Sequence, residues 1–430
     1  MELPIALLVI AAAIYFVFRG TDVRLVLFTA GLTLASIAGH PLSVFKAFER
    51  SIGDATTIGP ICSAMGYAFV LRATGCDREM VRLLLAPVRR VKWLLVPGAC
   101  VVGFVTNIAI TSQTGAAASV GAIIIPLMLA AGYHPIIAGA TLVLGCSGGG
   151  SLYNVGDADL VALQAGVKAP MSDVLGAMFL PLLGGFTVAV VTFTWLSRRP
   201  PTDVVTTASF APVDESEPIH FFKALLPPLP VMMIFSMLPT LNFFPALRKI
   251  YDRGLPVSHA MLLSTIIVLL VYRKELSART KAFFDGMGFA YINVISLIVT
   301  ASCFIEGMKA MGLIERMVGA ISANGALGWF ASGVSTCLLG VLSGSGIAPS
   351  VAFSQAVLPT YSVADPGGAI ALGVWAAIAA NFGRTMSPVA AVVIFTATLV
   401  NVTPMQLAKR TAVPMIVGAL AAFLVVFVHR

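Results

Sequence analysis

Charged residues are scarce in this sequence. Asp, Glu, Lys and Arg make up 11% of the 430 residues, whereas hydrophobic residues make up 58%. The mean hydropathy is +0.95, and about a quarter of an ordinary soluble chain is charged. Too few polar side chains are present to cover a soluble globule of this size. We therefore predict an all-α polytopic membrane protein, whose helices satisfy their own backbone hydrogen bonds in lipid.

The sequence also lacks the motifs of enzymes and of ATP-driven pumps. It has no P-loop, no zinc-spaced His and Glu set and no nucleophile elbow. Its six cysteines lie far apart, without a CxxC pair, and fit small core residues. The net charge of +8 sits in short loops between apolar segments, which is typical of membrane proteins. We predict no enzyme activity, no cofactor, no firmly assigned metal and no nucleic-acid partner.

Apolar segments long enough to cross a bilayer follow one another along the chain. A span needs about 20 mainly apolar residues. Two apolar regions, 93–132 and 324–360, are too long for one helix and are interrupted by Ser, Thr and Gly, so we predict re-entrant hairpins there. About ten segments are predicted transmembrane helices: 4–19, 23–39, 55–73, 136–165, 174–195, 222–240, 257–272, 283–305, 367–400 and 411–428.

Two of these spans are predicted to be discontinuous helices. Span 136–165 is broken by the run 146–151, and span 367–400 by the run 381–388. The order of three single spans, a hairpin, a broken span and a single span thus occurs twice. Weak sequence similarity accompanies this order at a nearly constant interval, since the step along the chain from Lys46 to Lys281 is almost equal to the step from Gly150 to Gly383.

The duplication predicts two inverted repeats. Each half has five spans, and because five is odd the second half enters the membrane in the opposite direction. We predict a first repeat at 1–196, a cytoplasmic linker at 197–221 and a second repeat at 222–430. Most of the 27 Lys and Arg residues lie in loops on one side of this topology. The excess predicts that both termini are extracytoplasmic. The N-terminus has no basic leader and no clear small-residue cleavage site, so the first apolar run is predicted to be retained as a span.

The hairpin tips and the two breaks are the predicted binding site. Interrupted helices are tolerated in a membrane only where protein or a cavity covers the break. Their N-termini suit a carboxylate, and their free carbonyls suit a cation, so a small anion is the expected substrate. The predicted substrate-binding residues are Thr111, Ser112, Gln113, Thr114, Gly115, Ser147, Asn154, Ser343, Gly344, Ser345, Gly346, Asn381, Arg384, Thr385 and Ser387. Equally, the hydroxyls and amides could serve only to satisfy the broken backbone.

The charged residues near the breaks lead to the most specific hypotheses about substrate binding and ion coupling. Arg384 lies within a predicted span, where an arginine is costly and normally faces a cavity. It either binds a substrate carboxylate, caps carbonyls at the break, or pairs structurally with an acid such as Asp157 or Asp159. Those two aspartates, with Asn107, are candidates for coupling to Na⁺ or H⁺; the alternative is that the aspartates sit near the outer mouth.

Two motifs resemble the Dcu type C family of anaerobic C4-dicarboxylate carriers, within the ion transporter superfamily. They are the run 343–350 (SGSGIAPS) in the second hairpin and the run 383–390 (GRTMSPVA) in the second break, and the resemblance extends from about Lys46 to the end. It implies carriage of succinate, fumarate or malate by an elevator movement of a homodimer. It also implies a bacterial inner membrane, in which the extracytoplasmic termini would be periplasmic. The run 112–115 (SQTG) departs from the Ser-Asn-Thr pattern of sodium-dependent relatives, which leaves the coupling ion open.

Two alternatives to this reading remain. A carrier of another organic anion or of an amino acid could use the same fold. An anion channel is the alternative from another class, but it needs a continuous polar pathway, whereas paired hairpins and inverted repeats predict alternating access.

Overall fold

The computed structural model describes residues 2–19, 21–87, 94–110, 112–199, 219–237, 251 and 255–429. These residues form helices and no strands, as predicted. Seven helical segments within them are long and apolar enough to cross a membrane, and five further apolar helices have 10–17 residues. About ten full-length spans were predicted; the difference arises because several are shorter or divided in the structure.

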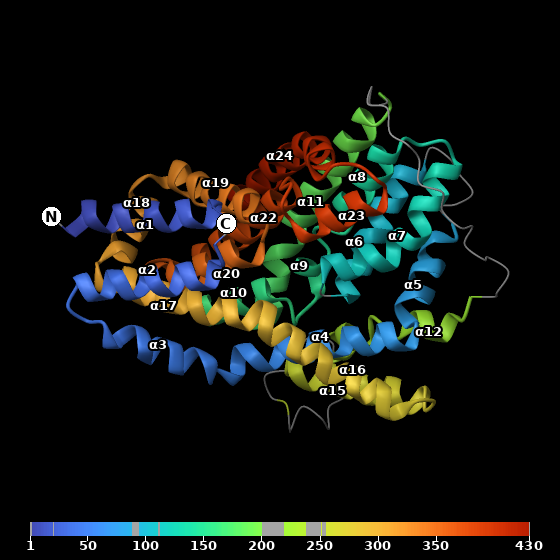
Figure 1. Cartoon of the computed structure of the whole chain (residues 1–430), viewed down its shortest axis with the longest axis horizontal. Helices are drawn as coiled ribbons and strands as arrows, with labels where there is room; N and C mark the ends of the chain where they lie inside the picture. The colour runs from blue at the N-terminus through green and yellow to red at the C-terminus, as the bar shows by residue number, and fades with distance from the viewer. Residues whose placement is uncertain are drawn as a thin grey trace.

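The helices fall into two groups (Figure 1). The long-helix group packs α2 and α3 against α17, and α15 and α16 against α4. It consists of α1 (Glu2–Phe18), α2 (Val23–Ile37), α3 (Leu42–Ile52), α4 (Ala55–Thr74), α15 (Val257–Val271), α16 (Leu276–Ala290), the π-helical turn η3 (Tyr291–Ile295) and α17 (Ser296–Ala310). Because α16, η3 and α17 are continuous, they form one helical segment of 35 residues, which is about 52 Å long.

The broken-helix group contains the regions that were predicted as hairpins and as discontinuous spans. Whether the helix pairs at the hairpin regions are re-entrant stays a prediction. Its first set comprises α6 (Leu95–Ala109), α7 (Gln113–Ala130), α8 (Pro135–Gly145), α9 (Gly150–Tyr153), α10 (Ala158–Val167) and α11 (Met171–Leu196). The second set comprises α19 (Gly325–Ser343), α20 (Ile347–Ala356), α21 (Leu358–Ala364), α22 (Pro366–Thr385), α23 (Ala391–Leu399) and α24 (Pro404–Val428). The broken helices are thus divided by the short helix α9 in the first set and by residues 386–390 in the second.

Short helices join the two groups. The remaining helices are α5 (Cys76–Leu85), α18 (Leu313–Ala323), α12 (Phe221–Leu225) and α13 (Leu229–Ser236). The first two, α5 and α18, follow α4 and α17 and lead into the hairpins; their apolar residues lie on one face, as in amphipathic helices. Neither was predicted, because each is too short and too polar for a span. Most of the linker 197–221 and the end of the expected span 222–240 lie outside the described residues.

The helix boundaries recur at nearly the interval found in the sequence. The step from Val23, which begins α2, to Val257, which begins α15, almost equals the step from Met171, which begins α11, to Pro404, which begins α24. The packing recurs too, since α2 contacts α17 as α15 contacts α4. These correspondences support the predicted duplication. The exact repeat boundaries stay predictions.

Small residues let the two halves approach closely at the crossing of α11 and α24. A Cβ atom on Gly185 would lie 2.8 Å from the carbonyl oxygen of Gly418, and a Cβ on Gly418 would lie 2.6 Å from the carbonyl oxygen of Gly185. These two glycines are separated along the chain by the same interval as Gly150 and Gly383. A residue that contacts its own counterpart lies on the axis of a two-fold arrangement, so the contact fits repeats related by a two-fold axis.

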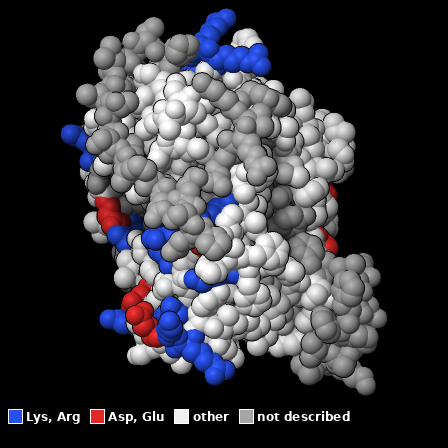
Figure 2. All heavy atoms as spheres, turned by 90° about the vertical axis from the view of Figure 1, so that its right-hand side faces the viewer, with Lys and Arg blue, Asp and Glu red and all other residues white. Residues whose placement is uncertain are grey.

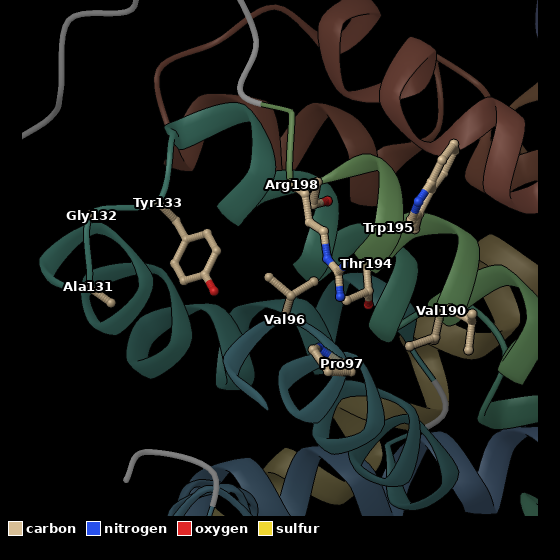
Figure 3. A pocket seen from close by; sticks show the side chains of 11 residues that line it. Val96, Pro97, Ala131, Gly132, Tyr133, Val190, Thr194, Trp195 and Arg198 are labelled. Carbon is tan, nitrogen blue, oxygen red and sulfur yellow. The ribbon is translucent and has the colours of Figure 1, made fainter. Parts of the chain in front are cut away.

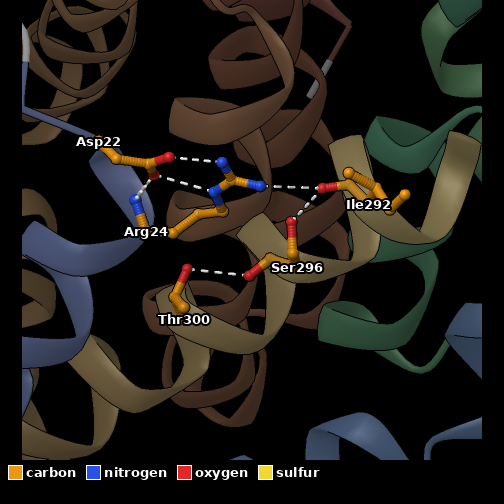
Figure 4. Close-up of polar contacts among 5 residues, drawn as sticks. All are labelled: Asp22, Arg24, Ile292, Ser296 and Thr300. Atoms are coloured by element: carbon orange, nitrogen blue, oxygen red, sulfur yellow. Dashed lines mark hydrogen bonds and ion pairs between the residues drawn. The ribbon is translucent and has the colours of Figure 1, made fainter.

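A polar contact also joins the halves at η3 (Figure 4). The guanidinium of Arg24 donates to the carbonyl oxygen of Ile292 at 3.2 Å, and the Ser296 hydroxyl donates to the same oxygen. Asp22 accepts from the Arg24 backbone N–H and Nε, both at 2.9 Å. The hydrogen bond with Arg24 lowers the pKa of Asp22 to about 2. A π-turn alters the regular backbone pairing, and Arg24 supplies a donor to one of its carbonyls.

We predict that Gly185→Ala destabilises the protein by about 1–3 kcal/mol, because overpacking a tight contact forces backbone shifts. The neighbouring Gly184→Ala is the matched control, since its Cβ would meet only Val425 Cγ2 at an ordinary 3.5 Å. Thermal unfolding of the purified variants in detergent measures the difference. Equal midpoints for the two variants would show that the α11–α24 contact is not tight.

Candidate functional site

Ends of broken helices from both halves meet at one small cavity. Three helix N-termini reach it, because Gln113 begins α7, Asp157 is the N-cap of α10 and Ile347 begins α20. Its volume of about 10 Å³ is close to the space that one water molecule needs. The lining residues are Asn107, Gln113, Gly150, Ser151, Asp157, Ile347, Asn381 and Arg384.

The tip of the first hairpin is bound to the first helix break. Asn107, in the last turn of α6, accepts a hydrogen bond from the backbone N–H of Gly150 at 2.9 Å and donates to the carbonyl of Ile110 at 3.1 Å. Gln113 donates from Nε2 to the carbonyl of Ser147 at 2.7 Å. Side-chain amides therefore satisfy backbone groups that the interrupted helices leave unpaired.

Two buried aspartates begin α10. Asp157 is 8% exposed and Asp159 1%. Asp157 caps the helix, accepting from the backbone N–H of Asp159 at 3.4 Å, as Asp does at many helix N-termini. Asp159 accepts a 2.5 Å hydrogen bond from Nδ2 of Asn381. Its Oδ1 atom has no partner among the described residues.

Asn381 joins the aspartates of the first half to the arginine of the second. Its Nδ2 also contacts the Ser151 hydroxyl at 3.2 Å, and its Oδ1 accepts a hydrogen bond from Arg384. Arg384 is partly buried, and its Nε has no partner among the described residues. In that part of the chain, no ion pair within 4.0 Å links Arg384 to an acid. Arg384 therefore reaches Asp159 through Asn381.

The structure brings together part of the predicted site. Asn107, Gln113, Asp157, Asn381 and Arg384 line the cavity. Asp159 and Ser147 each lie one hydrogen bond from a lining residue. Contrary to the predicted break at 381–388, α22 continues through Asn381 and Arg384 to Thr385. The interruption starts only at Met386, close to Pro388, which disfavours helix at the residue before it.

The other predicted residues do not line this cavity. Several of their side chains bond to nearby backbone: Ser112 accepts from Gly115 N, Asn154 from Gly156 N, Ser345 from Ala348 N and Ser387 from Val389 N, while Thr385 donates to Asn381 O. Ser343 likewise donates to Leu339 O and accepts from Ser345 N. The remaining ones are Thr114, Gly115, Gly344 and Gly346; a Cβ on Gly346 would collide with the Asn381 amide. Thr111 lies outside the described residues. Direct substrate contact by any of these remains a prediction.

Three lining residues were not in the predicted site. Gly150 and Ser151 end the glycine-rich run that marks the first break, so their place at the site could have been predicted from this run. Ile347 lies in the second hairpin motif, directly after Gly346. An isoleucine carries no chemical sign of a polar site, and only the folded hairpin brings it to the cavity.

Comparison with known proteins decides the family. Residues 49–430 match the family described as DcuC, C4-dicarboxylate anaerobic carrier. The chain belongs to the DcuC family. A DcuC-type anaerobic C4-dicarboxylate transporter of Vibrio cholerae is 25% identical over 97% of this chain and 95% of its own length. The anaerobic C4-dicarboxylate transporter DcuC of Escherichia coli K12 is 24% identical over 97% of this chain and 94% of its own length.

A solved structure shows the fold. The YdaH transporter of Alcanivorax borkumensis matches with a TM-score of 0.63, 14% identity and coverage of 94% of this chain and 96% of that chain. The family match, the relatives and the seven apolar helices show that this DcuC-family chain is a multi-pass inner-membrane transporter and not an enzyme.

We predict that Asn107→Ala lowers transport at least tenfold, because the N–H of Gly150 loses its partner. An unsatisfied buried donor costs about 1–3 kcal/mol, and the break would shift. Asn324→Ala is the control, because Asn324 is an exposed residue that donates to the carbonyl of Ala320 at 2.7 Å. Uptake per folded protein, quantified after purification and reconstitution, separates the two. Full activity in Asn107→Ala would disprove the role of this contact.

Proposed function

We propose that the chain carries C4-dicarboxylates such as succinate, fumarate or malate, coupled to a cation gradient or to exchange. One observation carries the proposal: Arg384 lines a buried cavity at which three helices, α7, α10 and α20, begin. A guanidinium suits a carboxylate in a bidentate arrangement, and helix N-termini favour a second negative group. The family and its relatives named above support four carbons over other carboxylates.

The charges at the cavity support coupling. Asp157 and Asp159 outnumber the single Arg384, so an added dicarboxylate would leave a large negative charge in a buried place. Such a charge is stable only when cations or protons accompany it. Asp157, which lines the cavity, and Asp159, whose Oδ1 atom has no described partner, are the candidate acceptors of Na⁺ or H⁺.

The size of the cavity supports alternating access. A space of about 10 Å³ is far too small for a dicarboxylate, so a hairpin must move for the substrate to enter. Both hairpins belong to the broken-helix group, and we propose that this group moves as a unit against the long-helix group, as in an elevator.

We propose a homodimer with contacts through α2 and α15, whose exposed leucines and isoleucines include Leu25, Ile37, Leu262, Ile266 and Leu270. A channel would need an open pathway, which this cavity does not supply.

The cleanest test is uptake of labelled succinate into proteoliposomes with sodium and proton gradients imposed separately. We expect uptake that depends on one gradient or on internal dicarboxylate, and competition by fumarate and malate. The absence of uptake under all three conditions, with competition by an unrelated anion or amino acid in a binding assay, would remove the dicarboxylate assignment.

In the same assay Arg384→Gln should reduce uptake at least a hundredfold, since a charge-assisted bidentate pair is worth about 1.5–3 kcal/mol per hydrogen bond. The control is Arg316→Gln, because Arg316 is an exposed residue on α18. Unchanged uptake in a folded Arg384→Gln variant would assign Arg384 to structure only.

We also propose that both termini face the periplasm. Lys and Arg gather on the end of the molecule shown in Figure 2, where α5 and α12 lie and which is remote from the N-terminus (Figure 1). Cytoplasmic loops carry the excess of Lys and Arg, so this end is assigned to the cytoplasm. Alkaline phosphatase fused after Arg430 should be active in cells; an inactive but stably produced fusion would reverse the orientation.

A further inference from the structure

A second hollow lies at the end of α11, away from the broken-helix cavity (Figure 3). Its volume is about 630 Å³. Val96 and Pro97 line it from the first turn of α6, whereas Asn107 lies near the other end of that helix, about 15 Å farther along. The lining residues are Val96, Pro97, Ala131, Gly132, Tyr133, Val190, Val191, Thr194, Trp195, Ser197 and Arg198, and we call this hollow the α11 groove.

The walls of the α11 groove are mainly apolar, but they contain unpaired polar groups. The hydroxyl oxygens of Thr194 and Ser197 are buried and have no hydrogen-bond partner among the described residues. Ser197 as a whole is 9% exposed. Buried hydroxyls nearly always have a partner, so these two indicate a ligand with acceptor atoms.

Arg198 supplies a charge beside these hydroxyls. In Figure 3, the side chains of Arg198, Thr194 and Tyr133 point into the same space above Pro97, whereas Trp195 points away from it. Arg198 is exposed and has no acidic partner in the part of the chain that the structure describes. The nearby Arg410 is already engaged, because it donates to the carbonyls of Leu196 and Arg199 at 2.7 and 2.9 Å. Among the described residues, no acid therefore competes with an anion for Arg198.

The position of the α11 groove indicates where its ligand comes from. Trp195 is 59% exposed, and the guanidinium of Arg199 lies 5.9 Å from its ring centre. Trp and Tyr followed by Arg are typical of the level at which a helix leaves the hydrocarbon region and meets lipid headgroups. Val190 and Val191 lie one to two turns before Trp195 on α11 and also line the groove. If Trp195 marks the headgroup level, these two residues are at the depth of the hydrocarbon region.

We propose that the α11 groove binds an anionic phospholipid. The phosphate accepts hydrogen bonds from Arg198, Ser197 and Thr194, and an acyl chain lies along Val96, Pro97, Val190 and Val191. A soluble anion such as free phosphate would leave these apolar walls uncovered, and a dicarboxylate would find no second cation among the described residues that line the groove. The inference concerns a different site from the transport cavity and does not depend on which solute is carried.

Native mass spectrometry of the delipidated full-length protein tests the proposal. Dioleoylphosphatidylglycerol is titrated against the wild type, Arg198→Gln and Ser197→Ala, and dioleoylphosphatidylcholine serves as the zwitterionic comparison. We expect phosphatidylglycerol to bind the wild type about tenfold more tightly than it binds Arg198→Gln, the loss expected for one charge-assisted hydrogen bond. Ser197→Ala should weaken binding several-fold.

Arg273→Gln is the matched control, because Arg273 is an exposed arginine between α15 and α16 that does not line the groove. Its affinity for phosphatidylglycerol should equal that of the wild type. Equal binding of the two lipids with no effect of Arg198→Gln or Ser197→Ala would overturn the proposal. Displacement of the lipid by glycerol 3-phosphate alone would also overturn it, because the groove would then be a site for a soluble phosphate ester.

Discussion

The chain of hydrogen bonds from Arg384 through Asn381 to Asp159 is the interaction on which the site depends. An arginine and a carboxylate inside a membrane protein are stable only when each has compensating partners. Here the side-chain amide of Asn381 is a partner to both groups, because its oxygen accepts from the guanidinium and its nitrogen donates to the carboxylate. The chain also joins the second half of the sequence to the first, so the cavity exists only when both halves are in place.

This arrangement requires helices that end inside the protein. Asn107 and Gln113 can reach the backbone of the first break only because the hairpin tip lies against it. Glycines make such approaches possible: a Cβ on Gly103 would lie 2.8 Å from the carbonyl carbon of Gly145, where α6 crosses α8. Close packing through small residues is a common way for membrane helices to associate. The same breaks that cost backbone hydrogen bonds thus create the donors and acceptors of the site.

The sequence predicted the fold well because its strongest signals are long-range patterns. Apolar segments, their interruptions and the nearly constant interval between the two halves placed the interruptions between α6 and α7, between α19 and α20 and within the broken helices close to their observed positions. The short amphipathic helices α5 and α18 were missed, since neither length nor hydropathy separates them from loops. The division of the chain at 197–221 stays a prediction.

The site was predicted less completely, for a physical reason. Arg384 and the two aspartates stood out because charge is rare in a span. Serines and threonines near the breaks were equally compatible with ligand contact and with backbone pairing. Geometry distinguishes these uses: Ser345 and Ser387 accept from backbone N–H groups in their own turns, whereas Ser151 contacts Asn381. The role of Ile347 depends on which hairpin meets which break, and no local sequence pattern records that.

The most direct test of the central claim is an experimental structure of the full-length protein with succinate. We predict a carboxylate group within hydrogen-bond distance of the Arg384 guanidinium, with the N-terminus of α20 displaced from Asn381 to make room. Succinate bound elsewhere, with the contact between Asn381 and Arg384 unchanged, would contradict the account.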